Sequence, residues 1–231
     1  RNLRSNVYKS LFEAFPKANV IDSKGKAISI EGGSLSRKFD VIICNWLHTD
    51  EYSTDKVKKG IMLYDKAEDK RLKDFPFTHI AQVDAKDRVL MESNYRRVIR
   101  LLKNLKVDAN PVIDLSSFMI TSIMYHMSNA DYNVTRSNST RLLVNTSKHL
   151  QRIVEDEAFR KSLDSPNKRE KLFAEKDSQK VEQVKRLKKE LDETIQDLVT
   201  DLAPLSSVLY DYNHPTVGRY YDILEKGVVT Y

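Results

Sequence analysis

Apolar residues recur at three- and four-residue intervals along the first fifteen positions of the chain. Leu3, Val7 and Leu11 lie at the spacing of one helical face, and Pro16 closes the segment. Because proline lacks a backbone donor and clashes with the preceding turn, it ends a helix. The pattern therefore predicts a helix over residues 3–15.

Short runs rich in β-branched residues follow, separated by turn-forming residues. They occupy residues 19–23, 26–31, 38–47 and 60–64. Such runs are typical of strands, and the third, which is the most apolar, is the strongest of them. The Gly-Gly-Ser of residues 32–34 predicts a hairpin turn. A loop is expected around Phe75-Pro76-Phe77.

Helical spacing returns at residue 93 and dominates the remainder. The predicted helices run from residue 93 through Leu105, from a cap at Asp114 to Met127, over residues 139–154, and over residues 178–203 before Pro204. The apolar stripe of the last helix allows two interpretations, docking on neighbouring helices or a coiled-coil partner face.

These elements indicate an α+β fold with a β-rich domain at residues 1–90 and a helical domain at residues 91–231. One helix and four or five short strands can cover one another only partly, so the β-rich domain has too few elements to bury its core. The chain also begins with Arg1 and not with Met. Both observations lead us to expect that an upstream segment is missing.

Composition narrows the class of protein. The 231 residues are 40% hydrophobic and carry a formal net charge of +6, with a pI near 9.2. No apolar run approaches the ~20 residues that cross a bilayer, so a cytoplasmic protein without membrane insertion is expected. The single cysteine, Cys44, excludes an internal disulfide framework and lies in an apolar run, which favours a buried structural thiol.

Three positions have chemical interest. Asp40 interrupts the most apolar strand, where a carboxylate is desolvated unless a metal or donors meet it; the plainer interpretation is a strand-end residue that reaches water. Cations crowd the helix from Tyr95 to Lys103, which suits phosphates, although a solvated helix side has the same composition. Ser117 and Phe118 begin an apolar helix, where they suit either an anion and a base or a simple cap with a core aromatic.

The order of these motifs is more specific than any one of them. A Lys-Ala-Ile-Ser-Ile strand, Arg-Lys-Phe-Asp-Val-Ile-Ile, Gly-Ile-Met-Leu, Phe-Pro-Phe-Thr-His, Tyr-Arg-Arg-Val-Ile-Arg-Leu-Leu-Lys and Ser-Ser-Phe follow one another. This succession resembles the polymerase-beta-type nucleotidyltransferases of the cyclic GMP-AMP synthase and oligoadenylate synthase group, especially the bacterial antiphage enzymes. The resemblance runs from about Val7 to Met127, with a weaker match over residues 163–202.

The resemblance implies a fold and roles for individual residues. The fold is an incomplete nucleotidyltransferase core with a mixed β-sheet, followed by a helical-bundle lobe. Asp40 matches the third metal-binding carboxylate, which would hold Mg²⁺ or Mn²⁺. Lys103 matches the lysine that contacts the donor triphosphate, and Ser117 and Phe118 match the pair that contacts phosphates and stacks on the base. Arg100, together with Arg96 and Arg97, has a less certain nucleotide-binding counterpart.

The chain also departs from the family pattern. Members carry a Gly-Ser turn and two acidic residues one position apart, both upstream of the helix that residues 3–15 resemble; neither is present here. Residues 32–34 lack a following acid pair and are not that turn. Two of three metal ligands are therefore missing, and these 231 residues alone should not catalyse.

The preferred hypothesis is a template-independent nucleotidyltransferase that joins nucleoside triphosphates into a cyclic or linear second messenger in antiphage defence, of which this chain is an incomplete portion. Two alternatives remain: a catalytically silent nucleotide- or partner-binding module, and an enzyme that transfers nucleotides to RNA ends. A regulatory protein partner fits any of them, while the modest charge does not favour specific nucleic-acid binding. Base preference, product size, linkage, activating signal and oligomeric state stay open.

Overall fold

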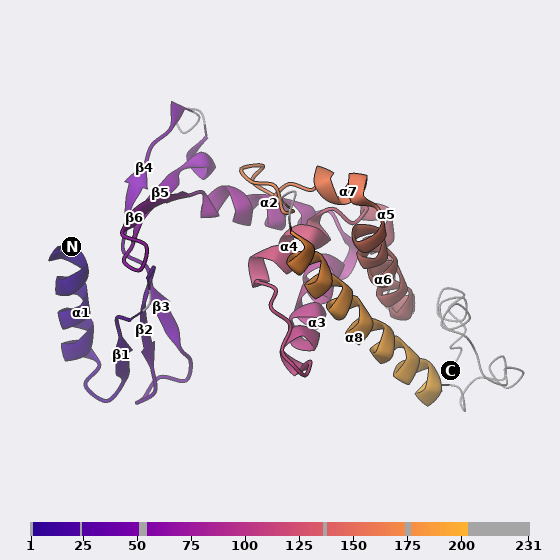
Figure 1. Cartoon of the computed structure of the whole chain (residues 1–231), viewed down its shortest axis with the longest axis horizontal. Coiled ribbons are helices and arrows are strands. Elements are labelled where there is room, and N and C mark those ends of the chain that lie inside the picture. Colours follow the sequence, from indigo (N-terminus) through magenta and orange to yellow (C-terminus); the bar gives the residue numbers. More distant parts are fainter. Residues whose placement is uncertain (1, 24, 51–54, 136–137, 174–176, 203–231) are drawn as a thin grey trace, which may run out of the picture. The chain divides into compact units, whose positions relative to one another are not determined.

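The computed structural model describes residues 2–23, 25–50, 55–135, 138–173 and 177–202 (Figure 1). The chain divides into two compact units, Arg1–Ala81 and Gln82–Tyr231. Among the described residues, those of the first unit form helix α1, six strands and the start of α2, and the elements of the second are helices. The α+β class expected from the sequence is confirmed. The separate expectation of domains at residues 1–90 and 91–231 stays a prediction.

The first unit begins with α1 (Asn2–Ala14), as the periodicity predicts. A meander of β1 (Asn19–Ile21), β2 (Ile28–Glu31) and β3 (Phe39–Val41) follows, with antiparallel pairing throughout. Its small core joins Val20, Ile28 and Ile30 to the inner face of α1. Gly32 and Gly33 both adopt positive φ between β2 and β3, which confirms the hairpin turn.

A second antiparallel meander joins β4 (Cys44–Leu47), β5 (Gly60–Asp65) and β6 (Lys70–Asp74). A short 3-10 turn, Lys56–Lys58, precedes β5. The strand predicted over residues 38–47 is therefore wrong as one element. Val41 makes the last pair with β2, and Cys44 makes the first pair with β5, so the chain changes sheets between them. An apolar run in sequence carries no information about which strand it pairs with.

Two further predictions for this unit are corrected. Cys44 is exposed, because β4 is an edge strand with a mostly exposed burial pattern. The expected loop around Phe75, Pro76 and Phe77 is in fact the start of α2 (Pro76–Arg88). Pro76 occupies the first helical position, where the missing backbone donor costs nothing.

The second unit comprises helices α3 (Asn94–Asp108), α4 (Ser117–Tyr125), α5 (Asn129–Tyr132), α6 (Ser139–Glu155), α7 (Glu157–Ser162) and α8 (Ser178–Leu202), with the 3-10 turn Met91–Ser93 before α3. Helices α6 and α8 match their predicted bounds to within one residue, and α3 extends three residues beyond the predicted Leu105. The N-cap of α4 is Ser116, whose hydroxyl accepts from the Met119 amide, and not Asp114 as predicted. Pro204, the predicted stop of the last helix, lies outside the described residues.

The packing of α8 decides between the two interpretations of its apolar stripe, docking on neighbouring helices or a coiled-coil partner face. The helix packs on α3 and α6, and its inward side chains are almost fully buried in the core of the unit. These side chains are Val184, Leu187, Leu191, Ile195 and Val199. Docking on neighbouring helices is therefore confirmed. None of the described helices is long and apolar enough to cross a membrane.

Candidate functional site

Asp40 lies in the middle of β3 and is exposed. The hydroxyl of Ser29, its cross-strand partner on β2, donates to Asp40 Oδ1, and Ser29 itself is fully buried. Of the two interpretations of Asp40, desolvation by its apolar neighbours is wrong and a residue that reaches water is confirmed, although Asp40 does not end its strand. β3 is an edge strand, and its aromatic neighbour Phe39 is itself 51% exposed.

A two-metal site needs several carboxylates, and the described part of the chain does not supply them. No group of three His, Cys, Asp or Glu side chains among the described residues could hold a metal ion. Asp40 is a single carboxylate with one face open to water. The described residues therefore do not by themselves fit the Mg²⁺ or Mn²⁺ that the family resemblance implies.

The basic residues of α3 differ in whether they form ion pairs. At 100° per residue, Arg96, Arg100 and Lys103 share one side of the helix, beside the buried face of Tyr95 and Leu102. Arg96 pairs with Asp84 and, at 3.0 Å, with Asp87. Arg100 and Lys103 form no hydrogen bond or ion pair with any residue that the structure describes. They are thus two adjacent cations that retain their full capacity to bind an anion.

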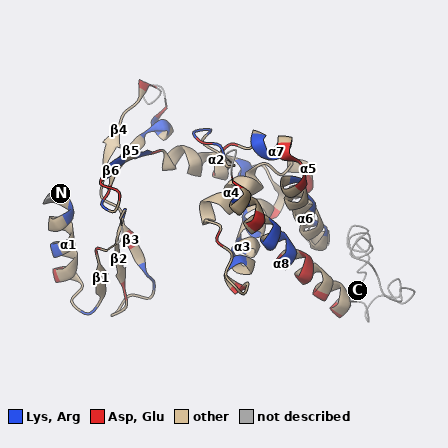
Figure 2. Ribbon diagram, viewed as in Figure 1, with Lys and Arg blue, Asp and Glu red and all other residues tan. Residues whose placement is uncertain are grey.

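The charges of α8 behave differently. Its basic residues lie in the first half, and acidic residues predominate in the second (Figure 2). Lys188 Nζ lies 2.5 Å from Asp192, and Lys189 Nζ lies 3.4 Å from Glu193, both at i,i+4 spacing. These cations are neutralised within their own helix. A long run of charges along a helix is therefore not enough to mark an anion site in this molecule.

The start of α3 is held in place by Asn94, which is 1% exposed. Its Nδ2 donates to the carbonyls of Tyr132 and Val134, at 2.8 Å each, and its Oδ1 accepts from Arg97 Nη1 at 3.0 Å. The preceding Ser93 has φ of +54°, a left-handed conformation that non-glycine residues seldom adopt. The axial position of α3, and hence of its two unpaired cations, is fixed by these contacts.

The start of α4 presents a hydroxyl and an aromatic ring. Ser117 is exposed, and its hydroxyl has no partner among the described residues, whereas its carbonyl accepts from Thr121 Oγ1 at 2.8 Å. Phe118 is 37% exposed, in contrast to the buried Met119 and Ile120 that follow it. The plainer interpretation of Phe118 as a core residue is therefore wrong.

Helices α3 and α4 are in direct contact. The Tyr95 hydroxyl on α3 donates to the Thr121 carbonyl on α4 at 2.9 Å, and burial raises the pKa of Tyr95. The structure thus places Arg100 and Lys103 on one of two joined helices and Ser117 and Phe118 on the other. Asp40 belongs to the other unit. The roles of all five residues stay predictions.

Lys86 on α2 was missed, because its segment was not expected to be helical. Its Nζ donates to Met127 O at 2.9 Å and to Asn129 Oδ1 at 3.0 Å. The rings of Tyr95, Tyr125 and Tyr132 lie within 5.3 to 6.0 Å of it. Burial lowers the pKa of Lys86. Because the rings come from three different helices, no spacing in the sequence could have revealed this cage.

The buried histidine is structural. His149 Nε2 lies 2.9 Å from the Ile123 carbonyl, and its ring packs edge-on against Phe159. Burial, opposed in part by that hydrogen bond, lowers the pKa of His149 to about 4. The imidazole is therefore neutral near pH 7.

Residues 82–196 match the model of the cGAS/DncV-like nucleotidyltransferase C-terminal helical domain. The cyclic dinucleotide synthase CdnE of Yersinia aleksiciae is 34% identical over 206 residues, which make up 87% of this chain and 52% of that protein. A c-di-GMP synthase of Capnocytophaga granulosa is 31% identical over 170 residues, 72% of this chain and 48% of that one. The chain thus spans about half the length of the curated relatives it matches.

Comparison with solved structures leads to the same family. The STING-associated CdnE c-di-GMP synthase from Capnocytophaga granulosa superposes with a TM-score of 0.71 at 28% identity, over 84% of this chain and 62% of that one. The CdnE c-UMP-AMP synthase of Rhodothermus marinus, at 18% identity and a TM-score of 0.62 over 92% of this chain and 68% of that one, shows the fold alone. The resemblance found in the sequence is confirmed, and residues 82–196 belong to the C-terminal helical domain family of the cGAS/DncV-like nucleotidyltransferases.

Proposed function

We propose that this chain is part of a template-independent nucleotidyltransferase that joins nucleoside triphosphates into a cyclic dinucleotide second messenger. The observation that carries the proposal is the 34% identity to a cyclic dinucleotide synthase over 87% of the chain. Each transfer would release pyrophosphate. A role in antiphage defence and a cytoplasmic location are part of the proposal.

The helical unit would bind the donor nucleotide. Arg100 and Lys103 have no partner among the described residues, so a triphosphate would not have to displace an existing ion pair. The free hydroxyl of Ser117 and the exposed ring of Phe118 begin the neighbouring helix. They suit a phosphate and a base respectively, and stacking on an aromatic ring contributes about 1–3 kcal/mol per base.

Asp40 would serve as one metal ligand of the complete enzyme. Its exposed carboxylate is oriented by Ser29. A divalent ion would neutralise charge on the reacting phosphate. Its remaining ligands would have to come from outside the described residues, so no catalytic step is derived through it.

The test is an incubation of the native-length protein with all four ribonucleoside triphosphates and Mg²⁺ or Mn²⁺, followed by mass spectrometry of the products. We expect a cyclic dinucleotide. Asp40→Asn should abolish it while the fold persists, because asparagine keeps an acceptor for the Ser29 hydroxyl and removes only the charge. Far-UV circular dichroism checks that the fold is retained.

Lys103→Ala provides a second arm, with Lys106→Ala as the matched control one turn further along α3. Losing one charge-assisted contact to phosphate should raise KM for the triphosphate by about tenfold or more, whereas the control should leave KM unchanged. Equal effects of the two variants would contradict the assignment of Lys103. Retained activity in Asp40→Asn would contradict that of Asp40.

Two other outcomes would select the alternatives. No product under any condition, together with no acid pair in the native sequence, would indicate a silent binding module. Nucleotides added to the end of a supplied RNA, with no cyclic product, would indicate an RNA-end enzyme. A product that forms only with cell extract would point to a regulatory partner.

A further inference from the structure

The first unit contains a cavity that the proposed nucleotide site does not use. Its volume is about 780 Å³, and it lies between the start of α1 and the sheet of β4, β5 and β6. All of its lining residues belong to the first unit. Small-molecule sites in proteins are commonly 300–1,000 Å³ and combine an apolar surface with a few polar groups.

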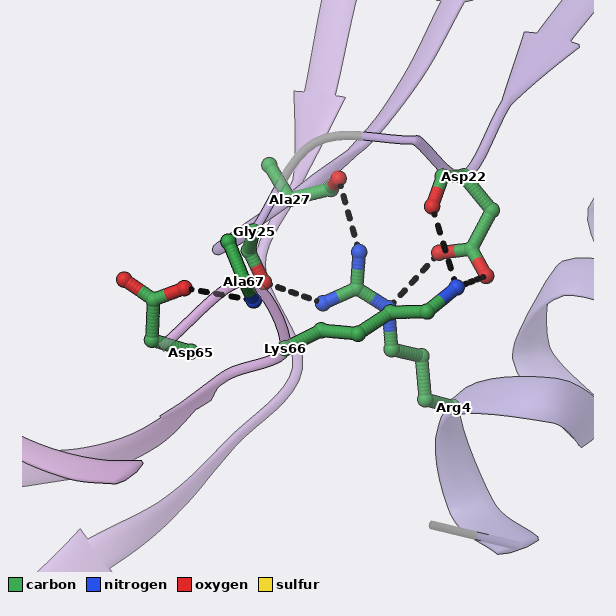
Figure 3. A network of polar contacts seen from close by, with 7 residues as sticks. All are labelled: Arg4, Asp22, Gly25, Ala27, Asp65, Lys66 and Ala67. Atoms are coloured by element: carbon green, nitrogen blue, oxygen red, sulfur yellow. Dashed lines mark hydrogen bonds and ion pairs between the residues drawn. The ribbon is translucent and has the colours of Figure 1, made fainter. Parts of the chain in front are cut away.

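One wall of the cavity is a fixed polar network (Figure 3). The guanidinium of Arg4 donates to Asp22 Oδ1 and to the Gly25 carbonyl, at 2.7 Å each, and to the Ala27 carbonyl at 3.1 Å. Lys66 Nζ donates to Asp22 Oδ2 at 2.9 Å. Because the Arg4 side chain is only 11% exposed, this wall is rigid, and its two cations share the single carboxylate of Asp22.

The floor of the cavity is one face of the second sheet. Met62 and Tyr64 point to the same side of β5, because alternate residues of a strand share a face. Asn45 on β4 is the cross-strand partner of Met62, and Arg71 on β6 is the partner of Tyr64. An apolar strip is thus flanked by an amide on one edge strand and a guanidinium on the other.

The Tyr64 hydroxyl at this floor donates to Asp69 Oδ1, whereas two other polar groups there are unused. Arg71 and Asn45 are exposed and form no hydrogen bond or ion pair with any residue in the described ranges. Three cations and two carboxylates line the cavity, so it carries one net positive charge. Since Arg4 and Lys66 already face Asp22, Arg71 is the cation left to meet a ligand.

We propose that this cavity binds a small organic anion, with its carboxylate or phosphate held by Arg71 and its apolar body lying on Met62 and Tyr64. Asn45 would supply a further hydrogen bond from the opposite edge. Such a ligand would bridge α1 and the second sheet. The site is separate from the residues proposed to bind nucleotide, and the inference does not depend on the enzymatic activity.

Cys44 provides a direct readout, because it is exposed and lines the cavity. The rate of its alkylation by the neutral reagent iodoacetamide is measured by peptide mass spectrometry while phenyl phosphate is titrated at constant ionic strength. Benzyl alcohol, which has the ring without the charge, and inorganic phosphate, which has the charge without the ring, are the comparison probes. A ligand that fills the cavity shields the thiol in proportion to its occupancy.

We expect saturable protection by phenyl phosphate, about threefold when its concentration is twice its Kd, and little protection by the other two probes. Arg71→Gln should abolish the protection. Lys70→Gln removes the same charge from the same strand but from its opposite face, because Lys70 is the cross-strand partner of Asp65, and it should keep the protection. Absent protection, equal protection by inorganic phosphate, or undiminished protection in Arg71→Gln would each overturn the proposal.

Discussion

Asn94→Asp is the sharpest test of how α3 is positioned, because it changes the chemistry of a buried side chain and almost nothing of its shape. The wild-type amide donates to two carbonyls, those of Tyr132 and Val134, and is 1% exposed. A carboxylate has no donor to offer, so both carbonyls lose their side-chain partner and face a negative charge. Leaving the Val134 carbonyl unsatisfied costs about 1–3 kcal/mol, and the Tyr132 carbonyl, which still accepts from the Val134 amide at 2.8 Å, loses about 1 kcal/mol. Burying the new charge beside them brings the loss to about 4 kcal/mol.

One contact opposes this loss. Arg97 Nη1 lies 3.0 Å from Asn94 Oδ1, and its attraction to a carboxylate would return about 1 kcal/mol at this half-exposed position. The net expectation is a decrease of about 3 kcal/mol in the free energy of unfolding, a large share of the 5–15 kcal/mol typical of a domain.

Urea unfolding followed by far-UV circular dichroism measures this decrease. Asn104→Asp is the matched control, since Asn104 is exposed on the same helix; its change should stay within about 0.5 kcal/mol. A decrease below about 1 kcal/mol for Asn94→Asp, or one equal to that of the control, would refute the reasoning that this amide holds α3 in place.

Two further predictions concern pH and packing. With a folded pKa of about 4 against an ordinary value of 6.5, His149 takes up its proton more readily in the unfolded chain, so stability present above pH 6.5 should fall by about 3 kcal/mol as the pH drops to 4. His149→Gln should flatten this part of the profile of unfolding free energy against pH, and identical profiles would refute the assignment. Gly25→Ala should cost about 1–3 kcal/mol in urea unfolding, because a Cβ there would overlap Asp65 Oδ1, and that 4%-exposed carboxylate cannot yield without losing its bond from the Ala67 amide. Unchanged stability in Gly25→Ala would show that Asp65 moves freely.

The sequence predicted the elements whose periodicity is long and unambiguous. Helices α3, α6 and α8 carry apolar residues at helical spacing over four or more turns, so local pattern and tertiary burial agree. The order of motifs was enough to identify the family, which the comparisons confirm. Both results depend only on the spacing and order of residues along the chain.

The errors arise where structure depends on pairing or on a choice between neighbouring residues. Residues 38–47 read as one strand because an apolar run does not reveal that its two halves pair with different partners. The N-cap residue of α4 is Ser116, although Asp114 is equally suited by residue type. Pro76 was taken for a loop residue, since proline at the first position of a helix looks locally like a turn.

The candidate site shows the same division. The residue types of Arg100 and Lys103 were visible in the sequence, but that Arg96 is paired and these two are not follows from Asp84 and Asp87 on another helix. The sequence left open whether Asp40 is desolvated or reaches water, because the answer depends on β3 being an edge strand. The sequence identifies the candidate residues, but the residues that surround each one in the fold decide whether its side chain is free to bind a ligand.

The burial of α8 in the helical core has a consequence for synthesis on the ribosome. Helices α3 and α6 leave the exit tunnel before α8, yet the side chains from Val184 to Val199 cover their apolar faces. Until α8 emerges, those faces are exposed in the nascent chain, which is a state prone to aggregation and to capture by chaperones. A stop codon between residues 178 and 199 would therefore remove part of the core, and the resulting truncated protein should be degraded.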